Sequence, residues 1–125
     1  MSASQPSEEH VTIERHGDVT ILVPAPSLES VDPGLVEHAA DVMLAPIRTD
    51  PMPLIVVDFS RVEYFGSTFL SVLLRCWKQA QSKGGLMVVA GVSDRARELL
   101  RVTSLDMVWP IYDSRREAIE ALEAD

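Results

Sequence analysis

The chain is poor in the residues that build disulfide-held or metal-held folds. Of its 125 residues, one is a cysteine, Cys76, and three are histidines. A single thiol cannot form an internal disulfide, and a free thiol without a secretory leader favours the reducing cytoplasm. His10, His16 and His38 have no paired spacing with one another or with Cys76, so the sequence offers no zinc ligand set. We therefore expect no metal or other cofactor.

Long apolar runs and excess positive charge are also missing. The longest apolar runs, such as residues 86–90, are far shorter than the roughly 20 residues of a membrane-spanning helix. Eleven Lys and Arg against 19 Asp and Glu give a net charge of −8, which repels nucleic acids and anionic membranes. We expect a cytoplasmic protein that binds neither. Residues 1–10 form a polar tail predicted to be disordered, and residues 11–123 are predicted to form a single domain.

The hydrophobic pattern that is present predicts an α/β fold. The predicted strands are residues 11–15, 19–23, 54–59, 86–90 and 107–112. The first two alternate around turn residues and predict a hairpin, whereas the third and fourth are almost wholly apolar, as in strands buried on both faces. A helix separates the third and fourth strands, which predicts a right-handed crossover between parallel neighbours. Pro110 places the last strand at an edge.

Four helices are expected around this sheet. Asp32 can cap the first, with Pro33 in its first turn, and Pro46 predicts that this helix ends or bends near Ala45. The second begins at Gly66 or Ser67. Its predicted inward positions are Leu70, Leu73, Leu74, Trp77 and Ala80. The predicted caps of the last two helices are Ser93 or Asp94 and Asp113 or Ser114. The pattern thus indicates a mixed sheet of about five strands with four surrounding helices.

Catalytic motifs are scarce. The sequence contains neither GxGxxG nor GxxxxGK[ST], the usual phosphate-cradling loops. Asp58 ends a strand, as a phospho-accepting aspartate would, but the hairpin ends in Pro-Ala-Pro instead of carboxylates that could hold Mg²⁺. Cys76 lies in mid-helix beside Trp77, which is typical of a small buried hydrophobic residue, and Ser67 has no recognisable base partner. We expect no enzymatic activity.

The remaining candidate is the segment of residues 62–70, between a buried strand and a helix. It places the hydroxyls of Ser67 and Thr68 at the first helical positions. Such hydroxyls are good helix caps, contributing about 1 kcal/mol by accepting a hydrogen bond from an unpaired N–H. A modified hydroxyl at the same place could instead regulate a protein contact. The residues alone leave both interpretations open.

A family resemblance bears on this choice. The buried strand ends in Asp-Phe-Ser at residues 58–60, and residues 62–70 read Val-Glu-Tyr-Phe-Gly-Ser-Thr-Phe-Leu. Together with the segments at residues 84–89 and 99–105, this resembles the STAS domain of bacterial anti-sigma factor antagonists. The usual family signature is Asp-Leu-Ser followed by Val-x-Phe-x-Asp-Ser-Ser/Thr-Gly-Leu. The resemblance covers residues 11–122 and implies the STAS fold.

The resemblance implies a non-enzymatic regulatory role. Ser67 matches the hydroxyl that the family phosphorylates, and Thr68 matches the residue after it. The implied partner is an ATP-dependent Ser/Thr kinase that also acts as an anti-sigma factor. Phosphate on Ser67 would weaken that contact through its charge and bulk. The expected partner-binding residues are Tyr64, Phe65, Gly66, Ser67, Thr68, Phe69, Ser71 and Arg75.

Two positions differ from the family signature. Gly66 replaces the acidic residue before the phosphorylated hydroxyl, and Phe69 replaces the glycine two positions after it. Two alternatives therefore stand beside the switch. The chain is a non-phosphorylated STAS scaffold subunit of a larger signalling assembly, or it is a small nucleotide-binding domain that uses a pocket near Ser67. The resemblance leaves open whether the chain forms a homodimer.

Overall fold

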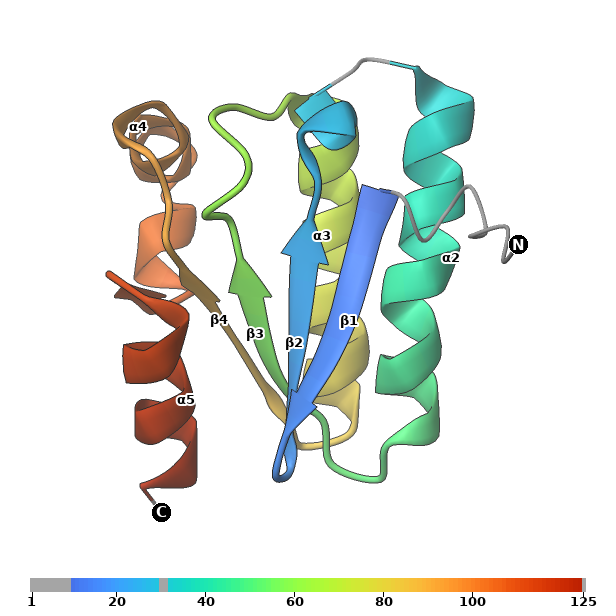
Figure 1. Cartoon of the computed structure of the whole chain (residues 1–125), viewed down its shortest axis with the longest axis vertical. Coiled ribbons are helices and arrows are strands. Elements are labelled where there is room, and N and C mark those ends of the chain that lie inside the picture. Colours follow the sequence, from blue (N-terminus) through green and yellow to red (C-terminus); the bar gives the residue numbers. More distant parts are fainter. Residues whose placement is uncertain (1–9, 30–31, 125) are drawn as a thin grey trace, which may run out of the picture.

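A computed structural model describes residues 10–29 and 32–124, in which five strands form one mixed sheet (Figure 1). The strands are β1 (Val11–His16), β2 (Val19–Pro24), β3 (Leu54–Asp58), β4 (Leu86–Ala90) and β5 (Ile111–Tyr112). They lie in the order β1-β2-β3-β4-β5, with β1 antiparallel to β2 and all other neighbours parallel. This confirms the predicted α/β class, the hairpin and the parallel centre of the sheet. The expected tail at residues 1–10 lies, apart from His10, outside the described residues.

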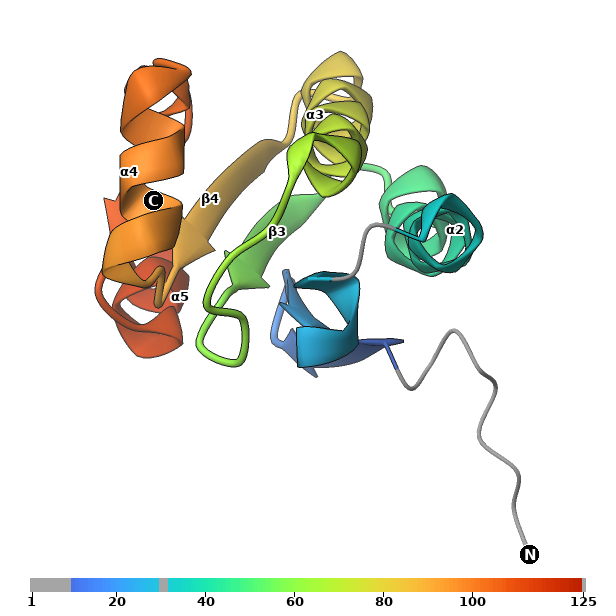
Figure 2. The same cartoon turned by 90° about the horizontal axis from the view of Figure 1, so that it is seen from above.

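Helices cover both faces of the sheet. They are α2 (Pro33–Thr49), α3 (Ser67–Ser82), α4 (Asp94–Val102) and α5 (Arg115–Glu123), with short 3-10 helices η1 (Pro26–Glu29) and η2 (Leu105–Met107). Helices α2 and α3 lie side by side on one face, and α5 packs against β3 and β4 from the other (Figures 1 and 2). None of the helices in the described ranges is long and apolar enough to cross a bilayer. The sheet is therefore the middle layer of a three-layer fold.

The central strands are apolar because they are buried on both faces. Along β3, Ile55 and Val57 join the core cluster under α2 and α3, whereas Val56 joins the cluster under α5. All three side chains are 0% exposed. The register that pairs β3 with β4 carries the same alternation across the sheet. Continuous apolar runs in the sequence therefore correctly predicted two-sided burial.

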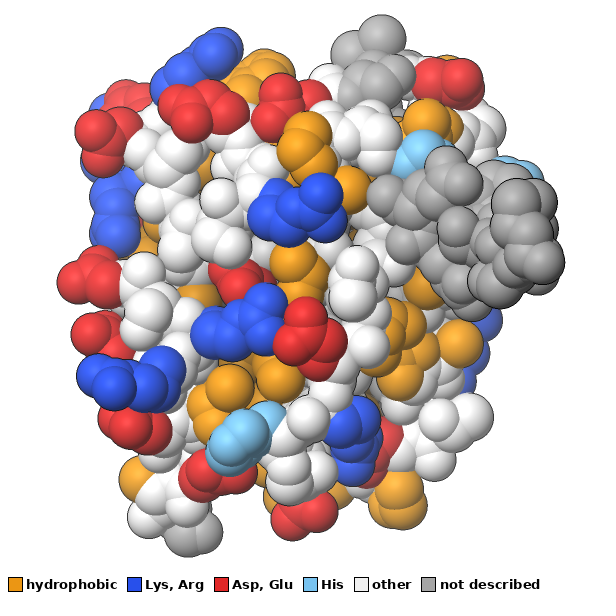
Figure 3. Space-filling view, in the orientation of Figure 1, with side chains coloured by type: hydrophobic (Ala, Val, Ile, Leu, Met, Phe, Trp, Pro, Cys, Tyr) orange, Lys and Arg blue, Asp and Glu red, His pale blue; other side chains and the backbone are white. Residues whose placement is uncertain are grey.

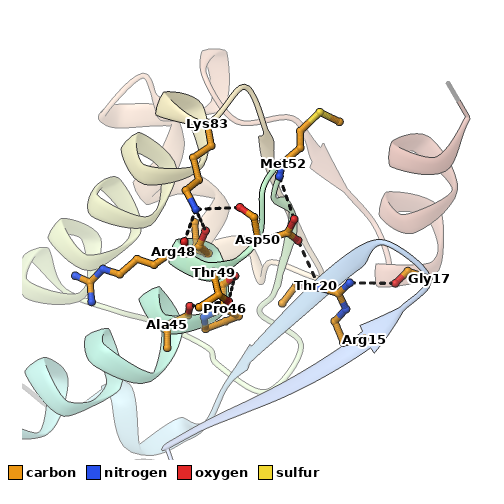
Figure 4. Close-up of polar contacts among 11 residues, drawn as sticks. Arg15, Gly17, Thr20, Ala45, Pro46, Arg48, Thr49, Asp50, Met52 and Lys83 are labelled. Carbon is orange, nitrogen blue, oxygen red and sulfur yellow. Dashed lines mark hydrogen bonds and ion pairs between the residues drawn. The ribbon is translucent and has the colours of Figure 1, made fainter.

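The sequence predicted that helix α2 ends or bends near Ala45, and it does not end there, because it continues past Pro46. It runs to Thr49, and polar side chains satisfy the carbonyls of its last turn (Figure 4). The Thr49 hydroxyl donates to the carbonyls of Ala45 and Pro46, each at 3.3 Å. Lys83 Nζ, from the end of α3, donates to the carbonyls of Ile47 at 3.3 Å, Arg48, and Asp50 at 3.0 Å. Pro46 has no N–H to donate to the Val42 carbonyl, so the helix continues with one intrahelical hydrogen bond fewer.

The last strand is shorter than predicted. Residues 107–112 were expected to be extended, but only Ile111–Tyr112 form β5, and the preceding residues turn as η2. The N–H groups of Val108 and Trp109 both donate to the Leu105 carbonyl, at 3.0 and 2.8 Å. Trp109 is 0% exposed, so its indole anchors this turn in the core. Core burial of one large side chain therefore overrides the strand propensity of the segment.

The face that helix α3 presents to the core overlaps the predicted one, since Leu73 and Ala80 are buried as expected. Its buried residues are Phe69, Val72, Leu73, Cys76 and Ala80. The predicted Leu70, Leu74 and Trp77 are only half-buried at the rim of that face. Cys76 is a small buried residue, as expected, and burial raises the pKa of its thiol to about 12. A thiol with that pKa is almost entirely protonated at neutral pH and is a poor nucleophile.

Candidate functional site

The predicted site lies where β3 passes into α3, at the carboxyl edge of the parallel strands (Figure 1). Ser67 and Thr68 occupy the first two positions of α3, and both are exposed to solvent. The following turn carries Ser71, also exposed, whose hydroxyl donates to the Ser67 carbonyl at 3.1 Å. Three hydroxyls thus line the first two turns of one helix on the surface of the molecule.

The start of α3 differs from that of the other long helices. Asp32 accepts a hydrogen bond from the Gly34 N–H at 2.9 Å at the start of α2. Ser93 and Ser114 do the same for the first turns of α4 and α5. The N-cap of α3 is Gly66, which has no side chain to accept such a bond. Because Ser67 already stands at the first helical position, the interpretation of Ser67 and Thr68 as caps is wrong.

Three aromatic rings support this helix start from beneath. The rings of Phe59 and Phe65 stack with centroids 5.1 Å apart, and Phe69 meets them edge-on at 6.3 and 5.7 Å. Phe65 is 0% exposed and Phe69 is 1% exposed, so the prediction that these two residues contact a partner is wrong. Phe69 instead fixes the first turn of α3 on the core. The rings hold the neighbouring polar residues outward.

Two polar residues clamp the loop that precedes α3. The Glu29 carboxylate, from η1, accepts a hydrogen bond from the Glu63 N–H at 2.9 Å. From the other side, the Ser93 hydroxyl donates to the Glu63 carbonyl at 2.5 Å while it accepts from the Ala96 N–H at 3.0 Å. Ser93 therefore caps α4 and holds the loop with the same oxygen. The sequence indicated the cap but gave no signal for the long-range contact.

The exposed rim of the site contains both aromatic and basic side chains. Tyr64 is 40% exposed, and the guanidinium of Arg95 lies 4.7 Å from the centre of its ring. Arg75, two turns beyond Ser67 on α3, forms an exposed ion pair with Glu37 of α2 at 3.2 Å. Arg95 was not among the predicted site residues. Its approach to Tyr64 brings the start of α4 to the same surface as the start of α3.

Asp58 ends β3 just before this loop and is already engaged within the fold. It is 4% exposed, and its carboxylate accepts from Arg115 Nε at 2.8 Å and from the Ser60 N–H at 3.0 Å. Arg115 also donates to Glu14 at 2.6 Å, and this hydrogen bond raises the pKa of the guanidinium. Asp58 thus joins α5 to the sheet.

The described residues contain no cluster of side chains suited to bind a metal ion. Within residues 10–29 and 32–124, no group of three or more His, Cys, Asp or Glu side chains is arranged to hold a metal. What the geometry provides is a helix start with exposed hydroxyls and no side-chain cap on its first N–H groups. Such a start can accept an anionic group with little rearrangement, because the N–H groups and the helix dipole favour negative charge.

Comparison with known proteins finds relatives that are named anti-sigma factor antagonists. An anti-sigma F factor antagonist of Paenibacillus polymyxa is 33% identical over 69 residues, which cover 55% of this chain and 59% of that protein. An anti-sigma factor antagonist homolog of Thermotoga neapolitana is 32% identical over 69 residues, covering 55% of this chain and 61% of that protein. The matches thus span less than two thirds of these relatives.

A solved structure extends the similarity over the fold. The anti-sigma factor antagonist (STAS) domain protein from Planctomyces limnophilus superposes with a TM-score of 0.81 and 29% identity, covering 90% of this chain and 97% of that one. The family model described as "STAS domain" matches residues 10–118. The sheet order, the helix start after β3 and these matches agree, and the chain belongs to the STAS domain family, in its anti-sigma factor antagonist-like branch.

Proposed function

We propose that the chain is a non-enzymatic regulatory module that binds a Ser/Thr kinase acting as an anti-sigma factor, and that phosphate on Ser67 switches this contact. The unphosphorylated module would sequester the kinase and free a sigma factor. Its place of action would be the cytoplasm. The curated relatives named as anti-sigma factor antagonists support this class of partner.

One observation carries the proposal, namely the exposed Ser67 hydroxyl on a helix start that no side chain caps. A phosphate there would meet unpaired N–H groups and the positive end of the helix dipole, so the domain can accept it without refolding. The same group adds about −1.5 to −2 charges to the docking surface. The partner would therefore lose affinity while the fold stays intact.

The proposed contact surface follows from exposure. It comprises Tyr64, Gly66, Ser67, Thr68, Ser71 and Arg75, with Arg95 added from α4. Phe65 and Phe69 belong to it only as the buried support. The Gly66 position is open, because a Cβ built there has no other atom within 4 Å. A partner can therefore approach the backbone of this turn closely.

The decisive experiment incubates the protein with ATP and the Ser/Thr kinase encoded nearest its gene. We expect mass spectrometry to find one phosphate on a peptide containing Ser67, and to find none with the Ser67→Ala variant. Phosphate on Thr68 in both proteins would move the switch by one residue. Stable binding of the kinase without any phosphate would favour the scaffold alternative.

A second measurement tests the nucleotide-binding alternative. Calorimetry of the isolated protein with ATP, ADP and GTP should show no saturable heat at nucleotide concentrations up to the millimolar range. Tight binding of any of the three would contradict a pure docking module. The controls are the Ser67→Asp variant and the unmodified protein, which should behave alike.

A further inference from the structure

A second surface feature lies away from Ser67, beside the start of β4. It is a groove of about 620 Å³ bounded by α3, η2 and the end of α5. The groove exists because the edge strand β5 is shorter than its neighbour β4. Strand β3 pairs with β4 from Leu86 to Ala90, whereas β5 pairs only with Val89 and Ala90. The first half of β4 therefore has no neighbouring strand on its outer side within the described chain.

The groove gathers large apolar side chains that the fold leaves exposed. Met107 is 85% exposed, Leu86 53% and Val108 41%, and all three line it together with the half-buried Trp77. Met107 is displayed by a turn that begins at Ser104, whose φ of 62° is left-handed. That conformation costs a non-glycine residue on the order of 1 kcal/mol. A strained turn that keeps a methionine side chain exposed to solvent is typical of a surface that binds a partner.

Two acidic residues lie close to residues that line this groove. Asp106 precedes Met107 in η2, and Glu117 lies one turn before the lining residue Ala121 on α5. Both acids are exposed, and neither lies within ion-pair distance of a cation in the described part of the chain, although Arg101 of α4 interacts electrostatically with Asp106. Lys78, the neighbour of Trp77, lines a different hollow, between α2 and α3. Figure 3 shows acidic side chains interspersed with Lys and Arg along the side of the molecule where α4 and α5 lie.

We propose that this groove binds a basic amphipathic segment of a partner protein, whose apolar side chains insert between Trp77 and Met107 while its Lys or Arg residues face Asp106 and Glu117. The charge argument selects this occupant. A second copy of the chain carries the same net charge of −8 and is repelled. The first nine residues of the chain are polar and include Glu8 and Glu9, so they fit neither the apolar floor nor the acidic rim.

The groove is independent of the proposed switch. Trp77 follows Ser67 by ten residues along α3, which at 1.5 Å per residue separates the two by about 15 Å. A kinase docked at the start of α3 would therefore leave the groove free. The groove adds a second partner surface to the proposed function, and loss of one contact need not affect the other.

The test uses a synthetic 16-residue helical peptide of Leu and Lys, with a Leu and Glu peptide of the same pattern as its control. Trp77 lines the groove, so a change in its fluorescence reports binding over the emission of the buried Trp109. We expect a saturable shift in emission with the Leu and Lys peptide alone, weakened by salt. Equal binding of the two peptides would contradict the charge argument, and no binding of either would overturn the proposal.

Matched variants locate the contact. Met107→Gln removes an exposed apolar side chain from the groove and should weaken binding about fivefold, as loss of a central apolar contact does. Met52→Gln makes the same change at a residue that is 56% exposed and lies outside the groove, and it should leave binding unchanged. Equal weakening by both would overturn the proposed site. Sedimentation that shows a homodimer dissociated only by Met107→Gln would identify a second copy as the occupant, against the proposal.

Discussion

The two ends of α3 differ in how their backbone groups are hydrogen-bonded. At its last turn, Gly84 and Gly85 donate to the carbonyls of Gln81 and Ala80, at 3.0 and 2.9 Å. There Lys83 extends to three carbonyls at the end of α2 (Figure 4). At its first turn, Gly66 provides no side-chain acceptor and Ser67 stands exposed.

The two ends of α3 therefore differ in whether their backbone polar groups are paired within the protein or left accessible. A helix end leaves up to four backbone groups unpaired, and a protein normally satisfies them with caps or with water. At the last turn of α3 the carbonyls of Gln79, Ala80 and Gln81 accept hydrogen bonds from the protein, whereas at the first turn no side chain caps the N–H groups. We infer that the last turn, the closed end, supports stability and that the first turn, the open end, supports binding.

The largest effect is expected at the closed end. Lys83→Met should lower the free energy of unfolding by about 2 kcal/mol, because it leaves partly buried carbonyls at the end of α2 without their charged donor. Urea denaturation measures this change. The control is Lys78→Met, on the same helix, whose side chain has no hydrogen bond or ion pair in the described part of the chain, and which should change stability by less than about 0.5 kcal/mol. Similar values for the two variants would show that Lys83 does not secure this end.

The next largest effect is expected at the first turn of α3, where a substitution should change the affinity for the kinase and leave the stability of the fold nearly unchanged. Ser67→Asp should weaken the kinase contact about tenfold, since it places negative charge on the docking surface, while its stability stays within about 0.5 kcal/mol of the unmodified protein. Ser67→Ala should keep the contact. Calorimetric titration of the kinase with each variant measures both affinities. If the two affinities are equal, Ser67 is not the switch.

A smaller effect separates the two jobs of Ser93. Ser93→Ala and Ser114→Ala each remove a helix cap and should each cost about 1 kcal/mol of stability. Only Ser93 also donates to the Glu63 carbonyl in the loop before α3. Ser93→Ala alone should therefore slow phosphorylation of Ser67 severalfold, as measured by mass spectrometry at fixed times. Equal slowing by both variants would trace the effect to stability and not to the loop.

The fold was largely predictable because its signals are local. Asp32, Ser93 and Ser114 precede their helices as side-chain caps, and the apolar runs of β3 and β4 mark strands buried on both faces. The errors arose where tertiary contacts override local preference. Helix α2 continues past Pro46 to a last turn that Lys83 of another helix hydrogen-bonds, and Trp109 turns the chain where a strand was expected.

The position of the candidate site could be predicted from the sequence, but not all of the residues that form it. The motif located Ser67 and Thr68 correctly on an exposed helix start. The burial of Phe69 was within reach, since it lies at helical spacing with Leu73, Cys76 and Ala80, all of them buried. Arg95 and the contact of Ser93 with Glu63 were not, because they depend on how the start of α4 packs against a loop some 30 residues earlier in the chain.

The smallest effect tests whether the open end can be closed. Gly66→Asp places an acceptor at the N-cap, where φ of −100° and ψ of −171° suit a capping residue and a Cβ meets no atom within 4 Å. It should raise stability by only about 0.3 kcal/mol, because glycine is itself a tolerated cap. Since the family signature has an acid at this position, the same change should speed phosphorylation of Ser67, measured by mass spectrometry against the unmodified protein. A stabilised variant that is phosphorylated more slowly would show instead that the kinase needs the backbone donors that Gly66 leaves unpaired.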